Sequence, residues 1–228
     1  WRGSAVSSVL QPVLFLAAMG LGLGSLVNRG HTGALGGVRY IVFLAPALLA
    51  AAAMQTAVME SSWPVMAAVK WLKTYDAMLA TPLRVRDLLA GHLTWIGMRV
   101  LMVCSIFLVV MALFGAIQSP EAALLIPVGL LTGLAFAAPV AGYAVTLERD
   151  SGLTALFRFG VIPMFLFSGT FFPVGQLPAL LQPIAYVTPL YHGVALARQL
   201  SLGTGTVSEA ILHGGVLVAF VVVGVVAC

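Results

Sequence analysis

Charged side chains are scarce in this sequence. Asp, Glu, Lys and Arg make up 8% of its 228 residues, whereas hydrophobic residues make up 61%. An ordinary soluble domain carries about 25% charged residues. A soluble fold of this length could not cover its surface with so few charges, so that class is excluded. The apolar character continues to the last residue, which also excludes a targeting peptide followed by a soluble domain.

Residues typical of reactive or metal-binding sites are few as well. Cys104 and Cys228 do not suggest a disulfide, and the four histidines are dispersed without the spacing of metal ligands: His31, His92, His192 and His213. No acidic residue or lysine lies near the middle of an apolar stretch, which argues against a proton relay. A sodium site built from backbone carbonyls stays open. We therefore expect no catalytic residue, metal or cofactor, and the net charge of +4 is too small and scattered to suggest nucleic acid.

Long uncharged stretches are what the sequence has instead. Six of them divide the chain, at 3–28, 40–59, 100–120, 122–147, 159–197 and 210–228. A membrane-crossing helix needs about 20 apolar residues, and five of these stretches are about that long. The pattern predicts an all-α polytopic membrane protein with six transmembrane helices. We place them at about 6–27, 40–60, 93–115, 123–145, 159–174 and 209–228.

Basic residues are distributed unevenly between the two sides of such a bundle. One side holds the amino terminus, the connection between the second and third helices extended to Arg99, and the 146–158 loop. It carries eight of the eleven Lys and Arg residues, and the other side carries Arg29, Arg39 and Arg198. Because positively charged loops stay in the cytoplasm, both ends of the chain are expected to be cytoplasmic.

The uncharged stretch at 159–197 is about twice the length of a span, and five prolines interrupt it: Pro163, Pro173, Pro178, Pro183 and Pro189. We expect short external helices that re-enter the outer leaflet between the fifth and sixth spans. Broken backbone at that depth is tolerated only where protein or water covers it.

The connection at 61–92 is the most structured polar part of the sequence. Pro64 suits the first turn of a helix from Trp63 to about Leu79. Thr81 as N-cap and Pro82 at the first position then predict a second helix that leads into the third span. The result is a helix–break–helix elbow at the membrane surface, with an ordinary solvated connector as the alternative.

Two segments resemble ABC-2 type transporter permeases, the membrane subunits of ATP-binding-cassette exporters. The first, at 73–91, reads KTYDAMLATPLRVRDLLAG and is similar to their intracellular signature. The second begins at 167 with FSGTFFPVGQLP and continues to TPLYHG at 188–193. It resembles the end of their fifth span and the external re-entrant segment. The resemblance is greatest to exporters of the daunorubicin-resistance and nodulation lipo-oligosaccharide type, and it covers the whole chain as one domain, 1–228.

The resemblance implies two permease subunits, as a homodimer or heterodimer, each seated on a separate ATP-binding subunit in a bacterial plasma membrane. The elbow would be the coupling helix. Its contacts with the ATPase would be made by seven residues: Tyr75, Asp76, Met78, Leu79, Thr81, Pro82 and Arg84. Glu148 and Arg149 would make a second cytoplasmic contact, with a plain solvated turn as the alternative. The amphipathic helix that the family carries before its first span has no counterpart here, so we expect both termini to be truncated.

The resemblance also implies a path for an amphiphilic cargo such as a drug, lipid or glycolipid. Phenylalanines in and beside the fifth span would line it, and ordinary packing against helices or membrane lipid is the alternative: Phe165, Phe167, Phe171 and Phe172. Gly129 and Gly133 have a spacing that lets helices approach closely, within the chain or, alternatively, at a dimer interface. A gradient-driven carrier or channel without an ATPase is the alternative function, and a membrane-embedded enzyme is a third that no residue supports.

Overall fold

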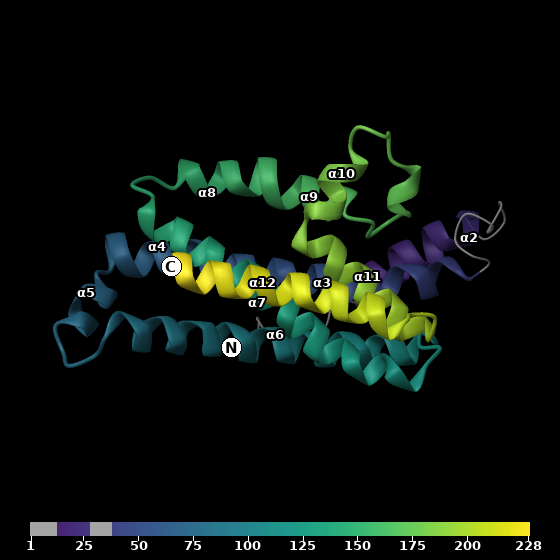
Figure 1. Cartoon of the computed structure of the whole chain (residues 1–228), viewed down its shortest axis with the longest axis horizontal. Coiled ribbons are helices and arrows are strands. Elements are labelled where there is room, and N and C mark those ends of the chain that lie inside the picture. Colours follow the sequence, from purple (N-terminus) through teal and green to yellow (C-terminus); the bar gives the residue numbers. More distant parts are fainter. Residues whose placement is uncertain (1–12, 28–37) are drawn as a thin grey trace.

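A bundle of long helices makes up the structure, a computed structural model that describes residues 13–27 and 38–228. Every regular element in these two ranges is a helix. The long helices run side by side, and their connections gather at the two ends of the bundle (Figure 1). Four stretches within the described ranges are long and apolar enough to cross a membrane: Tyr40–Trp71, Val85–Leu113, Pro120–Thr146 and Val207–Ala227. The prediction of an all-helical fold with apolar helices of membrane-spanning length is thereby confirmed.

These four stretches correspond to the predicted second, third, fourth and sixth spans. The third is longer than expected, because α6 (Val85–Leu113) already begins at Val85. Of the predicted first span, only 13–27 is described, and it contains η1 (Leu16–Leu23) and α2 (Gly24–Val27). The rest of that span and the following connection at 28–37 lie outside the described residues.

The predicted bounds of the fifth span, 159–174, are wrong. A continuous helix begins at Ser151 and ends at Phe167, through α8 (Ser151–Leu156), η5 (Phe157–Val161) and α9 (Ile162–Phe167). Arg158, expected in a loop, therefore lies inside the helix. The helix stops early because Gly169 adopts a φ of +82°, which turns the backbone away. At 17 residues, this apolar helix is shorter than the four long stretches.

The centre of the bundle is α3 (Tyr40–Ser61), which is buried along most of its length. It packs against α6, against α7 (Leu125–Thr146) and against α11 (Pro189–Leu202). Gly133 of α7 faces Val100 of α6, and a Cβ there would lie 3.0 Å from a Val100 methyl. Gly129 of α7 likewise faces Cys104 of α6. Both glycines therefore serve packing within the chain, which confirms that interpretation over a dimer interface.

The carboxyl-terminal part covers α7 from the other side. The last helix, α12 (Val207–Ala227), packs along α7, where Gly224 lies against Pro139. Its start is capped by the Thr206 hydroxyl, which accepts the backbone N–H of Glu209 at 3.3 Å. Helix α11 fits between α3, α7 and α12 and ends at Gly203, which has a φ of +66°.

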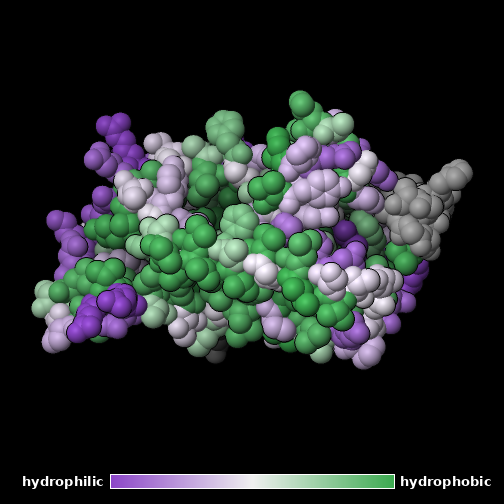
Figure 2. All heavy atoms as spheres, in the orientation of Figure 1, coloured by the Kyte–Doolittle hydropathy of each residue, from purple (hydrophilic) through white to green (hydrophobic). Residues whose placement is uncertain are grey.

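Between α9 and α11 the chain forms the short helices η6 (Val174–Gln176) and α10 (Gln182–Val187). A small apolar cluster of Val174, Leu177 and Ala185 holds this excursion together. In Figure 1 it projects beside α11. Hydrophobic side chains cover the middle of the face in Figure 2, whereas hydrophilic ones gather mainly toward the two ends. That distribution suits a bundle with its middle in lipid.

Candidate functional site

The elbow at 62–84 joins α3 to α6 at one end of the bundle (Figure 1). It begins at Ser62, whose backbone leaves the helical region (φ −97°, ψ −97°). Pro64 then lies in the first turn of α4 (Trp63–Met66), as predicted, and η3 (Ala67–Trp71) continues it. The prediction of one helix from 63 to 79 is wrong, because Lys73 takes a left-handed conformation with a φ of +50°. A separate helix, α5 (Thr74–Leu79), follows this break.

The predicted start of the next helix at Thr81 and Pro82 is also wrong. The Thr81 hydroxyl donates to the carbonyl of Met78 at 2.6 Å and so closes the end of α5. Helix α6 begins only at Val85, because the Asp87 carboxylate accepts the backbone N–H of Arg84 at 3.0 Å. A carboxylate in the first turn of a helix is stabilised by the free N–H groups there.

Tyr75 fixes the orientation of α5. It is the only residue of α5 that is not exposed, and its hydroxyl lies 3.3 Å from Nδ1 of His92 in α6. Burial raises the pKa of the Tyr75 hydroxyl above its ordinary value, so this group stays a neutral hydrogen-bond partner. Tyr75 therefore attaches α5 to the bundle.

The remaining predicted contact residues of the elbow are exposed: Asp76, Met78, Leu79, Thr81, Pro82 and Arg84. Apolar side chains are prominent at this surface, and we call five of them the elbow face: Trp71, Leu72, Met78, Leu79 and Leu83. Trp71 and Leu72 are 62% and 70% exposed. An exposed apolar patch bordered by charges is typical of a protein interaction site.

The loop between α7 and α8 lies at the same end of the bundle. Glu148 and Arg149 are exposed there, as a contact site requires. One apolar cluster joins this loop to the elbow: Val65, Met66, Ala141, Ala144 and Leu153 are buried in it, with Trp63, Tyr75 and Leu147 packed against them. The rings of Trp63 and Phe157 lie 4.9 Å apart. The two predicted cytoplasmic contacts thus share one packed base.

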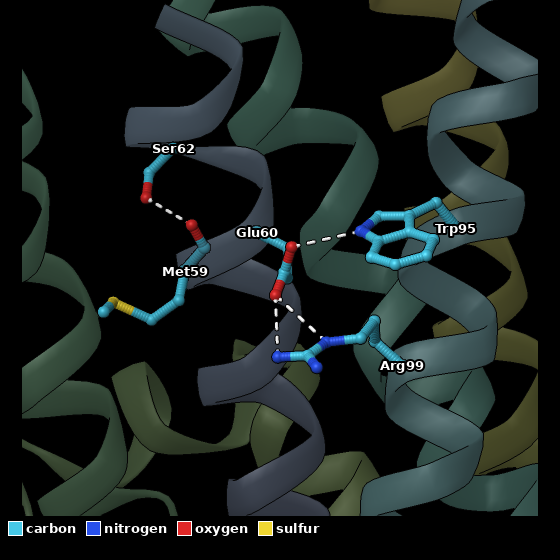
Figure 3. A network of polar contacts seen from close by, with 5 residues as sticks. All are labelled: Met59, Glu60, Ser62, Trp95 and Arg99. Carbon is cyan, nitrogen blue, oxygen red and sulfur yellow. Dashed lines mark hydrogen bonds and ion pairs between the residues drawn. The ribbon is translucent and has the colours of Figure 1, made fainter. Parts of the chain in front are cut away.

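An ion pair holds α3 to α6 just inside the elbow (Figure 3). Glu60 Oε1 lies 3.1 Å from a terminal guanidinium nitrogen of Arg99 and accepts its Nε–H at 3.2 Å. The indole N–H of Trp95 donates to the other carboxylate oxygen at 3.2 Å. The sequence analysis did not predict a contact between Glu60 and Arg99. Their opposite charges on consecutive antiparallel helices were the signal for the pair.

The four predicted path residues do not form one continuous surface. Phe165 and Phe171 meet edge to face at 5.1 Å, and Phe165 also contacts Phe15 at 6.4 Å. Phe167 is 40% exposed on α9, and Phe172 packs against the small cluster of the external excursion. Within one chain, the structure brings only Phe165 and Phe171 together.

Two histidines that look dispersed in the sequence meet at the far end of the bundle. His192 of α11 and His213 of α12 are buried with their Nδ1 atoms 2.8 Å apart. One ring must donate and the other accept. The Tyr191 ring lies against both, with centroids 5.3 Å and 5.9 Å away. The described residues contain no cluster of three metal-ligand side chains, and His31 lies outside them.

Arg198 connects three elements near this pair. Its guanidinium donates to the carbonyls of Phe43 in α3 and Gly169 after α9, at 3.2 Å and 2.9 Å. The charge also lies 3.7 Å from the centre of the Phe43 ring, within cation–π range. The backbone after α9 is further held by Tyr40, whose hydroxyl donates to the carbonyl of Phe171 at 3.3 Å. Sequence reasoning had assigned no role to Arg198.

A bundle with several apolar helices of membrane-spanning length is typical of a polytopic membrane protein. Comparison with known proteins defines it further. Residues 1–202 match the family model described as ABC-2 type transporter, and the chain belongs to this family. It is therefore the membrane subunit of an ABC transporter.

Several curated relatives are named Nodulation protein J. The chain is 33% identical to the one from Rhizobium leguminosarum bv. trifolii over 229 residues, covering 98% of this chain and 84% of the relative. It is 32% identical to the one from Rhizobium meliloti (strain 1021), with the same coverage of both. Identity falls to 25% with the one from Azorhizobium caulinodans.

Proposed function

We propose that this protein is the permease subunit of an ATP-driven exporter in a bacterial plasma membrane, with 1–228 forming one domain of six spans. Four long apolar helices support this, together with the apolar helix Ser151–Phe167 and the partly described first span. The end that carries α5 holds Lys70, Lys73, Arg84 and Arg86, and it faces the cytoplasm by the positive-inside rule. Both termini then lie in the cytoplasm as well.

The elbow is the part that receives the movement of a separate ATP-binding subunit. The observation that carries this proposal is the exposed elbow face on a base shared with the Glu148–Arg149 loop. The predicted residues have two different roles. Met78, Leu79, Thr81, Pro82, Arg84 and Asp76 contact the ATPase, whereas Tyr75 keeps α5 attached to α6.

Movement at the elbow reaches the middle of the membrane through the helix Ser151–Phe167. Its first turns pack into the shared cluster at Leu153 and against Trp63 at Phe157. Its last turn carries Phe165 and Phe167, and Arg198 holds the backbone that follows. In a pair of permease subunits, Phe167 lines the path from its exposed position, and Phe165 and Phe171 form the wall behind it. An apolar lining suits an amphiphilic drug, lipid or glycolipid.

The external excursion re-enters the outer leaflet in this arrangement. Helix α10 leaves Ile184 and Val187 exposed at 65% and 70%, so lipid covers these side chains.

Leu79→Asp tests the docking surface. Leu79 is 41% exposed on the elbow face, so the substitution leaves the bundle intact but places a charge in the apolar contact. We expect loss of co-purification with the ATP-binding subunit and loss of ATP-dependent export in inverted vesicles. Val207→Asp is the matched control, because Val207 is 77% exposed at the start of α12, at the opposite end of the bundle. Full export by Leu79→Asp would show that the elbow does not couple the permease to the ATPase.

Vesicles also test the alternative of a gradient-driven carrier. Transport should stop when ATP is depleted while the proton gradient is maintained. Orientation is tested separately, with one cysteine added at Ala80 or at Thr204 in a Cys228→Ser background, where the remaining Cys104 is buried. Intact cells should label Thr204→Cys from outside, and Ala80→Cys should react only after permeabilisation. The reverse pattern would overturn the orientation.

A further inference from the structure

An apolar groove runs between α6 and α12 over the surface of α7. Both outer helices pack on α7, and the groove between them has a volume of about 350 Å³. Leu93, Gly97 and Leu101 of α6 line it, together with Leu130 and Leu134 of α7 and Val221 of α12. The absent side chain at Gly97 opens it toward α7, since a Cβ there would lie 3.5 Å from Leu130.

The lining side chains offer a polar ligand no free hydrogen-bond donor. Thr94 is the one hydroxyl in its lining, and that hydroxyl already donates to the carbonyl of Ala90 in its own helix at 2.7 Å. An occupant of this groove is therefore a hydrocarbon chain.

Along the membrane normal, the groove extends over about one leaflet of a bilayer. With 29 residues, α6 is about 43 Å long at 1.5 Å per residue. That length equals the thickness of a bilayer with its headgroups, about 40–45 Å, around a hydrocarbon core of about 30 Å. The first turns of α6 then lie among the headgroups. Leu93 lies about 5 Å inside the hydrocarbon, and Leu101 lies near the midplane.

Arg86 lies on the face of α6 that lines the groove, closer than the groove to the start of the helix. Arg86 precedes Leu93 by seven residues and Gly97 by eleven, and both intervals are close to whole numbers of helical turns. Its side chain is exposed and lies at headgroup depth. The nearest acid along the chain, Asp87, is engaged with the backbone N–H of Arg84. Basic side chains next to transmembrane helices attract anionic lipid headgroups.

We propose that this groove is a binding site for an anionic phospholipid, with one acyl chain between α6 and α12 and the phosphate on Arg86. Arg86 selects the headgroup, and Gly97 provides the space for the chain. The site is separate from the elbow face and from the phenylalanines of the cargo path. Its occupation does not depend on the direction of transport.

Lipid retention by the purified full-length chain tests the site. Native mass spectrometry is carried out with equal amounts of phosphatidylglycerol and phosphatidylcholine that have identical acyl chains. The wild-type chain should retain phosphatidylglycerol preferentially. Arg86→Gln should lower that retention about fivefold, the factor that corresponds to one basic residue at a membrane surface. Lys70→Gln is the matched control, because Lys70 is an exposed cation of η3 at the same end and does not line the groove.

Gly97→Leu tests the acyl-chain part of the site by filling it. This variant should lose retention of both lipids, whereas Gly91→Leu should behave as wild type because nothing lies within 4 Å of its Cβ position. A photoreactive acyl chain on phosphatidylglycerol tests the wild-type chain directly and should label peptides around Leu93–Leu101. Equal retention of the two lipids would overturn the proposal, as would labelling spread evenly over all the spans. Unchanged retention in Arg86→Gln, or a second protein chain in the groove instead of lipid, would also overturn it.

Discussion

Glu60→Gln should weaken the junction between α3 and α6 more than any surface substitution of the same kind. The carboxylate of Glu60 accepts from two nitrogens of Arg99 and from the indole of Trp95 (Figure 3). Gln keeps the size of the side chain but removes its charge. The perturbation therefore isolates the charge of the pair from its packing.

The magnitude follows from the position of the pair. Removing one partner of a fully buried pair costs about 3–5 kcal/mol, whereas pairs in water are worth about 0.2–1 kcal/mol. The side chains of Arg99 and Glu60 are 28% and 23% exposed. Glu60 is the second-last residue of α3 (Tyr40–Ser61), so the pair lies near the end of the bundle and water screens its exposed part to some extent. We expect a loss of about 2 kcal/mol in the free energy of unfolding, between these two limits.

Reversible unfolding in mixed detergent micelles, followed by circular dichroism, measures this loss. Glu121→Gln is the matched control, because Glu121 is exposed in η4 (Pro120–Leu124) at the other end of the bundle. The double variant Glu60→Gln/Arg99→Gln should recover part of the stability, because both charges are then absent from the membrane. A loss below 0.5 kcal/mol for Glu60→Gln, or strictly additive losses in the double variant, would refute this reasoning.

Two further substitutions probe the elbow and the helix packing. Tyr75→Phe should cost about 1 kcal/mol of stability, because the hydrogen bond to His92 is lost; it should also lower export per ATP hydrolysed in reconstituted vesicles, and an unchanged ratio would contradict the attachment role. Gly133→Leu should prevent close packing of α7 against α6, where a Cβ would already touch Val100. Gly215→Leu is its control, since its Cβ position is open, and equal melting temperatures of these two variants would contradict the packing.

The long helices were predictable because lipid imposes one simple requirement on a sequence. A span needs a long uncharged stretch, and α3, α7 and α12 follow the uncharged stretches within a few residues. The errors fall where local contacts set a helix end. The left-handed backbone of Lys73 interrupts the helix predicted within the elbow, and the positive φ of Gly169 ends α9. The hydrophobicity of a sequence does not indicate which single residue adopts the backbone conformation that ends a helix.

The elbow was predictable as a location, and its inward side was not. A helix of six residues is too short for its apolar pattern to define a face, so Tyr75 was grouped with the exposed contact residues although it turns toward His92. Contacts between distant segments were missed for a different reason. His192 with His213, and Arg198 with Phe43, meet only because α11 packs against both α12 and α3.

The polar contacts of the bundle are concentrated at its two ends, and this placement bears on how the chain can move. Glu60 and Arg99 fasten α3 to α6 beside the elbow, whereas His192 and Arg198 fasten α11 to α12 and α3 at the far end.

Helix Ser151–Phe167 is tied at both ends, by apolar packing at Leu153 and by the Arg198 bond to Gly169 just after it. Its middle carries exposed Phe159 and Ile162. Apolar surfaces slide past one another without losing directional bonds. Under the proposed function, this helix is therefore the element that can shift against lipid or a second subunit while the fastened ends keep the α3-centred core intact.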